Sequence, residues 1–534
     1  LASSLVGGGT YAGFSRPRGL EAAAAADEQG TVRRVSMGPA ATVAFRAQQL
    51  LTRHAFVVAS LPARRAGVRQ LEALIAQRRR EELLIVEMAP PEDKAPQLLP
   101  LGISGLHASR PGGLTSPTTR HLGLVAGIDL APTALRWLHV RVPADMRGLP
   151  IVVSGPRDAG GLKAFSQRIT EIGKYRLITA EGMMLLWLAL VLALGALRGG
   201  WDGSLRRGLR LGSLAFMWAP TFVLLEAAAA PASSGTGLAL IAVPSFGAAW
   251  LTDRRLPWPR GPIAPMASAL LVYTVDLANH SHLIVQSVLG PNPKFGSRYF
   301  GLGNEFKSGL TVMLLVGLAA AMTGWGKSRR AAAVFAGGGL VLGVILGAGR
   351  LGAGVGGVII VAAGAAVATL LMLPGRPSRR AIALAVLSPL GALALLAAID
   401  LATGGNGHLS RNVLGHTDAA NLTDIVVRRV GLAWNALANG RRMPLVVAAG
   451  VIAIAFAYRN RRWLYGPLND PAWTAALIGG LTCGVVGSVA EDSGPLLFVV
   501  AAFALIIVTA YIQGDPKLLT GRQLLAVAGG HERP

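Results

Sequence analysis

From residue 177 onward the chain is a series of apolar runs separated by short polar segments. A helix needs roughly 20 apolar residues to cross a hydrocarbon layer about 30 Å thick, and most of these runs approach that length. The pattern predicts an α-helical multi-pass membrane domain over 177–512 with eleven transmembrane helices. The third and ninth runs are short and the third contains Pro244, so a re-entrant segment is an alternative for each. The runs lie at 177–197, 209–230, 238–252, 263–279, 306–323, 331–348, 352–373, 381–401, 443–458, 471–490 and 495–512.

Residues 1–176 carry charge throughout, and short apolar segments alternate there with amphipathic ones. This alternation is typical of a soluble α/β domain. The sequence predicts a strand within 54–62, a helix over 65–80, a buried strand within 82–90, and a strand, turn and helix over 124–140. Residues 513–534 then form a polar tail.

Composition supports the membrane interpretation. Of the 534 residues, 52% are hydrophobic and 15% are charged, and the mean hydropathy is +0.49. The net charge is +24. No compact basic region with interleaved aromatics occurs, so we expect no nucleic-acid partner and a lipid bilayer as the surroundings. The single cysteine, Cys483, excludes an intrachain disulfide and a thiolate metal cluster. The chain opens at Leu1 without a signal segment, and we expect further residues to precede it.

The basic residues between the runs predict an orientation. Loops between the first and second runs and between the seventh and eighth are rich in arginine, as in Arg206, Arg207, Arg376 and Arg379, and the alternate loops hold fewer basic residues. Short basic loops face the cytoplasm. The soluble domain is therefore expected outside a bacterial cytoplasmic membrane and the tail inside. This orientation brings the polar segments near Asp276–Glu305, Arg350, 402–442 and Glu491 to the outer side.

Asp276 and His280 are four residues apart at the end of the fourth run. On one helix face they would form a base oriented by an acid, so both are candidate catalytic residues. The alternative is a helix end with interfacial polar residues.

The segment 297–305, SRYFGLGNE, is a candidate anion site. Arg298 and Tyr299 precede a Gly-Leu-Gly step, and Asn304 and Glu305 open the next helix. Free N–H groups at a helix start together with an arginine suit a phosphate or pyrophosphate. We expect Arg298, Tyr299 and Asn304 to bind substrate and Glu305 to act as a base. The alternative gives Asn304 the role of N-cap and Glu305 that of a favourable first-turn acid.

The glycine-rich segment 347–357 contains G-x-G-x-x-G. It joins two apolar runs and does not follow a strand, so it does not predict a dinucleotide site. Small residues there favour close helix packing. Arg350 at its tip is a candidate phosphate contact.

Two further polar segments carry candidates. In 405–418, His408 and Arg411 are candidate substrate-binding residues, but the spacing of its histidines is not a metal signature, so we predict no metal. A helix lying on the outer surface is predicted over 424–437. In EDSGP, 491–495, capping accounts for Ser493 and Pro495. Glu491 is expected to pair with basic groups opposite and is a candidate substrate-binding residue, and Asp492 is a candidate catalytic acid.

Two regions resemble a known family. The segment 114–151, with its threonine- and arginine-containing turn, D-x-x-P-T and M-x-G, is similar to the C-terminal part of alkaline-phosphatase-superfamily domains. RYFGLGNE, GAGVGG, GHLS and EDSG resemble a family of bacterial multi-pass proteins that carry such an extracytoplasmic domain. The family's Asp and His metal ligands and its nucleophile have no counterpart here, because no D-H-G pattern occurs and the histidines at 54, 107, 121 and 139 are isolated. The resemblance therefore implies a truncated or degenerate phosphatase-like domain.

These observations lead to a function hypothesis. We expect a bacterial cell-envelope membrane protein whose outer polar basin binds or processes a phosphate-bearing or lipid-linked substrate. A transporter or flippase is the second hypothesis, with Glu226 and Asp276 as acids within spans. A noncatalytic scaffold is the third. The sequence predicts no particular cofactor.

Overall fold

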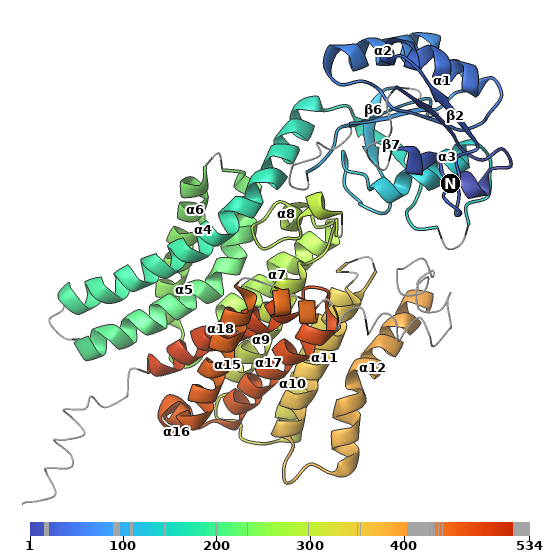
Figure 1. Cartoon of the computed structure of the whole chain (residues 1–534). Helices are drawn as coiled ribbons and strands as arrows, with labels where there is room; N and C mark the ends of the chain where they lie inside the picture. Colours follow the sequence, from blue (N-terminus) through green and yellow to red (C-terminus); the bar gives the residue numbers. More distant parts are fainter. Residues whose placement is uncertain are drawn as a thin grey trace, which may run out of the picture. The chain divides into compact units, whose positions relative to one another are not determined.

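The structure is a computed structural model that describes residues 1–534 except 15–20, 89–96, 107–109, 144–145, 198–200, 232, 297, 350, 353, 403–426, 428–430, 432, 436, 440–441 and 516–534. It divides into two units (Figure 1). Leu1–Thr170 and Pro293–Tyr299 form the first unit, and Glu171–Asn292 and Phe300–Pro534 form the second. We call them the α/β unit and the helical unit.

The α/β unit begins with a three-stranded parallel sheet in the order β2-β1-β3. Its strands are β1 (Thr10–Gly13), β2 (Arg34–Met37) and β3 (Val57–Ala59). Parallel neighbours need a crossover, and α1 (Val43–Leu51) lies between β2 and β3 in the sequence. With α2 (Arg64–Gln77) it closes a small core that contains Ala12, Ala44, Ala47, Leu50 and Leu74.

Two antiparallel pairs complete this unit: β4 (Leu84–Glu87) with β5 (Leu101–Ser104), and β6 (Gly112–Thr115) with β7 (Val152–Pro156). The predicted strand in 54–62 and the predicted helix over 65–80 correspond to β3 and α2. The strand in 82–90 corresponds to β4, which is half-buried and not fully buried, because its sheet has two strands. The remaining elements are α3 (Leu130–Trp137) and the short 3-10 helices at Ala2–Ser4, Ala22–Ala25, Ala40–Thr42, Gly127–Asp129 and Pro293–Phe295.

The strand predicted at the start of 124–140 is wrong. This segment forms a 3-10 turn, Gly127–Asp129, and then α3. The Asp129 carboxylate explains the turn, because it accepts hydrogen bonds from the Ala126 amide at 3.0 Å and from the Ser116 hydroxyl at 2.6 Å. Side-chain bonds of this kind compete with strand pairing.

The helical unit contains a helix for each of the eleven predicted apolar runs. Eight helices in the described part of the chain are long and apolar enough to cross a membrane, or nine if a bent pair, Ala433–Asn439 with α15, counts as one span. α7 is too short for this test. α9 is not among the eight, and its first turn is polar, with Glu305 and Lys307. The eleven-span count therefore stays a prediction. The helices are α4 (Ala159–Leu197), α5 (Trp201–Ala229), α6 (Ser234–Arg255), α7 (Ile263–Ala278), α8 (His282–Val285), α9 (Asn304–Ala321), α10 (Arg329–Gly347), α11 (Val355–Met372), α12 (Arg379–Ala402), α15 (Met443–Arg459), α16 (Arg461–Tyr465), the 3-10 helix Gly466–Leu468, α17 (Pro471–Ala490) and α18 (Pro495–Gln513).

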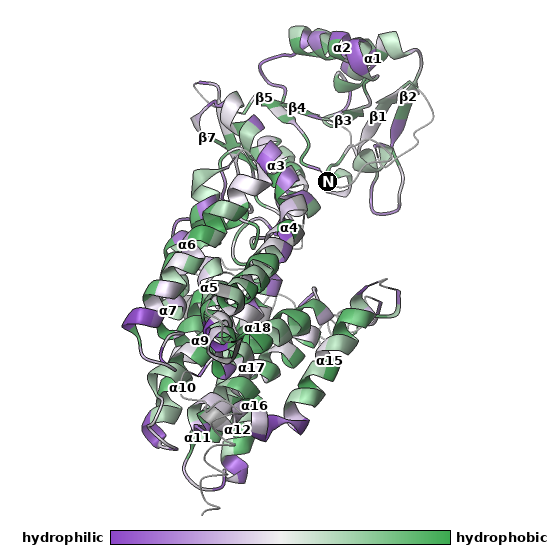
Figure 2. Ribbon diagram, turned by 90° about the vertical axis from the view of Figure 1, so that its left-hand side faces the viewer, coloured by the Kyte–Doolittle hydropathy of each residue, from purple (hydrophilic) through white to green (hydrophobic). Residues whose placement is uncertain are grey.

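Small residues allow the central helices to pack closely. α11 and α17 meet at Gly364 and Gly479, where a Cβ on Gly364 would lie 2.9 Å from the Gly479 carbonyl oxygen. Close approach through glycine is typical of membrane helix pairs. Cys483, also on α17, is fully buried, and its thiol donates to the Gly480 carbonyl oxygen at 2.9 Å. Most residues along the helices of this unit are hydrophobic (Figure 2), and large apolar side chains such as Leu384 and Val386 are exposed, as lipid-facing helices require.

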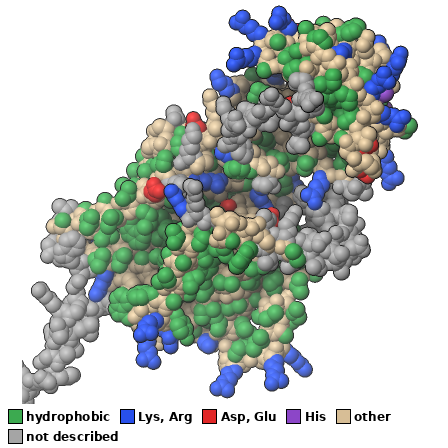
Figure 3. Space-filling view, in the orientation of Figure 1, with side chains coloured by type: hydrophobic (Ala, Val, Ile, Leu, Met, Phe, Trp, Pro, Cys, Tyr) green, Lys and Arg blue, Asp and Glu red, His purple; other side chains and the backbone are tan. Residues whose placement is uncertain are grey.

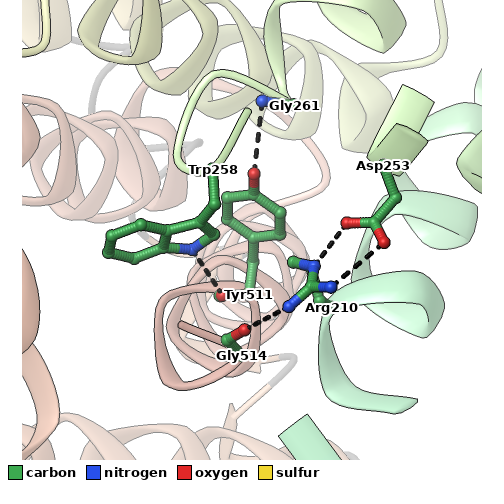
Figure 4. Close-up of polar contacts among 6 residues, drawn as sticks. All are labelled: Arg210, Asp253, Trp258, Gly261, Tyr511 and Gly514. Carbon is green, nitrogen blue, oxygen red and sulfur yellow. Dashed lines mark hydrogen bonds and ion pairs between the residues drawn. The ribbon is translucent and has the colours of Figure 1, made fainter. Parts of the chain in front are cut away.

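One end of the helical unit is closed by a polar cluster (Figure 4). Arg210 on α5 binds both carboxylate oxygens of Asp253 on α6, and it donates to the Gly514 carbonyl oxygen at 2.8 Å. The Tyr511 hydroxyl accepts from the Gly261 amide at 3.2 Å. These bonds join α5, α6 and the end of α18. Arginine and lysine side chains gather along the loops at this end (Figure 3).

Candidate functional site

At the opposite end, the first turn of α9 holds a buried ion pair. The Lys307 side chain is 1% exposed, and its Nζ lies 2.6 Å from Glu491 Oε1. Nζ also donates to Asn304 Oδ1 at 3.0 Å. Glu491 directly follows α17 and its side chain is 5% exposed. An ion pair withdrawn from water among apolar helices requires such complementary partners, because isolated buried charges are costly.

Glycines at the start of α11 make room for this pair. A Cβ on Gly356 would lie 2.4 Å from the carboxyl carbon of Glu491, and one on Gly354 would lie 2.8 Å from Lys307 Nζ. On Gly357 it would lie 3.0 Å from Lys307 Cδ. The sequence predicted that the glycine-rich segment allows close helix packing, and in the structure Gly354, Gly356 and Gly357 make room for the ion pair.

Glu305 lies in the same turn of α9. It is half-buried, and its Oε1 accepts a hydrogen bond from the Ser493 hydroxyl at 3.2 Å. Ser493 belongs to the same connection between α17 and α18 as Glu491. Glu305 and Glu491, both predicted site residues, are therefore brought to one site. Asp492, which lies between Glu491 and Ser493 in this connection, is exposed.

Asn304 does not have the role of helix cap. Gly303 occupies the N-cap position, and Asn304 is the first residue of α9. Its side-chain oxygen accepts from Lys307, so it supports the ion pair.

The predicted pairing of Asp276 with His280 on one helix face is wrong. α7 ends at Ala278, and both His280 and Ser281 adopt left-handed backbone conformations with φ near 64° and 62°. The Asp276 carboxylate instead accepts from the amides of Leu283 at 3.0 Å and Ile284 at 2.8 Å. It therefore satisfies the start of α8, while His280 is exposed.

Arg176 is a site residue that sequence reasoning missed. It donates to the carbonyl oxygen of Gly290, and its Nε is buried without a hydrogen-bond partner in the described part of the chain. Gly290 adjoins Gly303, since a Cβ on Gly303 would lie 3.6 Å from the Gly290 carbonyl carbon. Burial lowers the pKa of Arg176, and the charge of Glu305 opposes that shift. An arginine directly before the apolar run at 177 was the available signal.

Arg298 and Tyr299 belong to the α/β unit, so the predicted anion segment 297–305 is divided between the two units. The Tyr299 hydroxyl donates to the Gly296 carbonyl oxygen at 3.2 Å. Burial raises the pKa of Tyr299, and the negative charge of Asp129 raises it further. Arg350, His408 and Arg411 lie outside the described residues, as does most of the helix predicted over 424–437.

The segment that resembles phosphatase-like domains forms a hydrogen-bond network around Asp129. Besides Ser116 and Ala126, its carboxylate accepts from the Thr118 hydroxyl at 2.5 Å and from the Leu149 amide at 2.9 Å. Thr133 accepts from the Ile151 amide at 2.8 Å. These contacts tie the D-x-x-P-T residues to the chain on either side, which is a structural role.

No group of three or more His, Cys, Asp or Glu side chains arranged to hold a metal ion occurs in the ranges that the structure describes. Comparisons with protein-family models, with curated proteins and with solved structures give no match.

Proposed function

We propose that this chain is a bacterial cell-envelope membrane protein that binds the phosphate-bearing head of a lipid-linked substrate at the first turn of α9. The observation that carries the proposal is the buried Nε of Arg176, which lacks a partner among the described residues. Arg176 bonds Gly290, which lies beside Gly303 at the start of α9, and Lys307 and Glu305 belong to the first turn of this helix. A buried N–H without an acceptor is costly and favours a bound anion. Helix N-termini add unpaired amides that suit phosphate oxygens.

Charge balance predicts how the head group binds. The site holds two cations, Arg176 and Lys307, and two acids, Glu305 and Glu491. A phosphate adds negative charge, so removing the charge of one acid should favour its binding. Glu305 is the acid to replace, since it is less enclosed than Glu491 and accepts a hydroxyl bond in place of an ion pair. In a reaction on the bound substrate, the same carboxylate would serve as the base.

The distribution of basic residues supports an orientation with the proposed site on the extracytoplasmic side of the cytoplasmic membrane. Arg254, Arg330, Arg380 and Arg462 belong to helix ends far in sequence from the α9 start, at the loops that the positive-inside rule assigns to the cytoplasm. For the α/β unit we propose a degenerate phosphatase-like domain, supported by its resemblance over 114–151 and by the structural use of Asp129.

The proposal is tested by binding of dodecyl phosphate to the purified protein in lipid nanodiscs, with dodecanol as the uncharged control. Removing a unit charge within a few ångströms of the ligand changes the binding free energy by about 1–3 kcal/mol, or roughly ten- to a hundredfold in Kd. Arg176→Gln is therefore expected to weaken binding, and Glu305→Gln to strengthen it. Arg207→Gln, near the start of α5 and away from the proposed site, is the matched control. Equal binding of dodecyl phosphate and dodecanol would contradict the proposal.

The buried position of Glu226 within a candidate span favours transport as a second candidate function. It lies on α5 and is 3% exposed, and a Cβ on Gly237 of α6 would lie 3.2 Å from its Oε1. Buried acids within spans often mark the paths of protons or substrates. Asp276 no longer supports transport, because its carboxylate is used by backbone amides. Loss of substrate movement across proteoliposomes in Glu226→Gln, with head-group binding intact, is the result expected of a transporter.

A further inference from the structure

An apolar cleft of about 450 Å³ lies between α10, α11 and α12. All three helices contribute small residues to its lining, such as Gly339, Ala362 and Ala392, and larger apolar ones, such as Leu340, Leu370 and Leu384. Two hydroxyls occur in the lining, Thr369 and Ser388, and Ser388 donates to the Ala385 carbonyl oxygen at 2.8 Å. The walls therefore suit a hydrocarbon occupant.

The cleft is elongated along the helices. On α12 its lining runs from Ala381 to Leu396. On α11 it runs from Val358 to Leu373, the residue that follows the end of this helix. Fifteen residues of helix correspond to roughly 22 Å, most of the thickness of a hydrocarbon layer of about 30 Å. All three helices are candidate membrane spans, so a chain in the cleft would run in the direction of the surrounding lipid chains.

One end of the cleft adjoins the buried ion pair. Val358 and Leu396 both line the cleft, and a Cβ on Gly347 would lie 2.4 and 2.6 Å from their side chains. Val358 directly follows Gly357, whose missing side chain makes room for Lys307. The first turn of α11 thus has the cleft on one face and the proposed head-group site on another.

We propose that the α10–α11–α12 cleft holds the hydrocarbon chain of the substrate whose phosphate binds at α9. This inference rests on the proposed function. A lipid tail gains little free energy by leaving one hydrocarbon environment for another. The cleft therefore selects and orients the chain through the fit of its shape. It directs one chain along α11 and so aligns the phosphate with Lys307 and Arg176.

A photoreactive probe tests the cleft directly. Dodecyl phosphate with a diazirine at the chain end is added to the full chain in nanodiscs, and labelled peptides are identified by mass spectrometry. We expect labels on the cleft faces of α10, α11 and α12. Ala385→Trp fills the cleft and should abolish them, whereas Val386→Trp, on a neighbouring residue that is 72% exposed, should not. Ala392→Phe is a second filling variant for the case in which the first does not fold.

The outcomes separate this inference from the proposed function. Labelling that persists in the filled variants, or that spreads over α15 as strongly as over the cleft, overturns the cleft assignment while leaving Arg176-dependent phosphate binding intact. A dodecanol probe that labels the cleft as strongly as the phosphate probe would leave the cleft as a chain site but overturn the proposed head-group function.

Discussion

Gly356 packs directly against Glu491, because a Cβ on this glycine would lie 2.4 Å from the carboxyl carbon. Gly356→Ala must therefore displace the carboxylate from Lys307. We expect a loss of about 1–3 kcal/mol in the free energy of unfolding, as for other overpacked interiors. The matched control is Gly337→Ala on α10, where a Cβ meets nothing within 4 Å. That change should stabilise the helix by about 0.5–1 kcal/mol. Thermal unfolding in detergent measures both, and equal melting temperatures would contradict the packing argument.

Lys307 and Glu491 should behave as a coupled pair. Removing either partner leaves an uncompensated buried charge, so Lys307→Met or Glu491→Leu should destabilise the helical unit by about 3–5 kcal/mol. The double variant Lys307→Met with Glu491→Leu should recover most of that loss, since neither charge remains. Additive losses in this cycle would show that the two side chains do not interact.

Arg210 should not tolerate replacement by lysine. Its guanidinium bonds both oxygens of Asp253 and the Gly514 carbonyl, and an ammonium cannot reproduce this planar arrangement (Figure 4). We expect Arg210→Lys to lower stability by about 1–3 kcal/mol, the range for hydrogen bonds to charged groups. Arg207→Lys on the same helix is the control. If both variants have the same melting temperature, the contacts of Arg210 contribute little to stability.

The raised pKa of Tyr299 predicts that the stability of the α/β unit depends on pH. Its pKa lies above the ordinary value of 10.0, first because of burial and then because of Asp129. A group with a raised folded-state pKa contributes stability that is complete below the unfolded pKa and is lost as pH rises through the folded one. The wild-type protein should therefore lose stability more steeply than Tyr299→Phe above pH 10, as unfolding by circular dichroism can measure. Identical alkaline profiles would exclude this contribution.

Much of the fold followed from local patterns. Apolar runs located the helices because a span must satisfy its backbone internally and present apolar side chains to lipid. The end of α7 could not be predicted, since His280 and Ser281 adopt a left-handed conformation that non-glycine residues rarely take. That turn redirects the Asp276 carboxylate from His280 to two amides.

The candidate site was predictable in part. Glu305 was recognised as a candidate base beside a predicted anion site, and Glu491 because capping did not account for it. Glu491 does pair with a basic residue, Lys307. The identity of that partner depended on a contact across 184 positions, and the contact of Arg176 with Gly290 spans 114. Such separations leave no periodic signal. The division of Arg298 and Tyr299 from Glu305 likewise reflects tertiary structure that local spacing does not encode.

The buried position of Cys483 has a practical consequence. It is the single cysteine of the chain, it is fully enclosed by α17 and its neighbours, and its thiol is bonded to a carbonyl. Maleimide reagents therefore have little access to the unaltered protein. A cysteine that replaces Arg330, on the predicted cytoplasmic side, or Lys294, on the predicted outer side, would then be the cysteine that reacts. Impermeant and permeant reagents applied to whole cells would then assign each helix end to its side of the membrane.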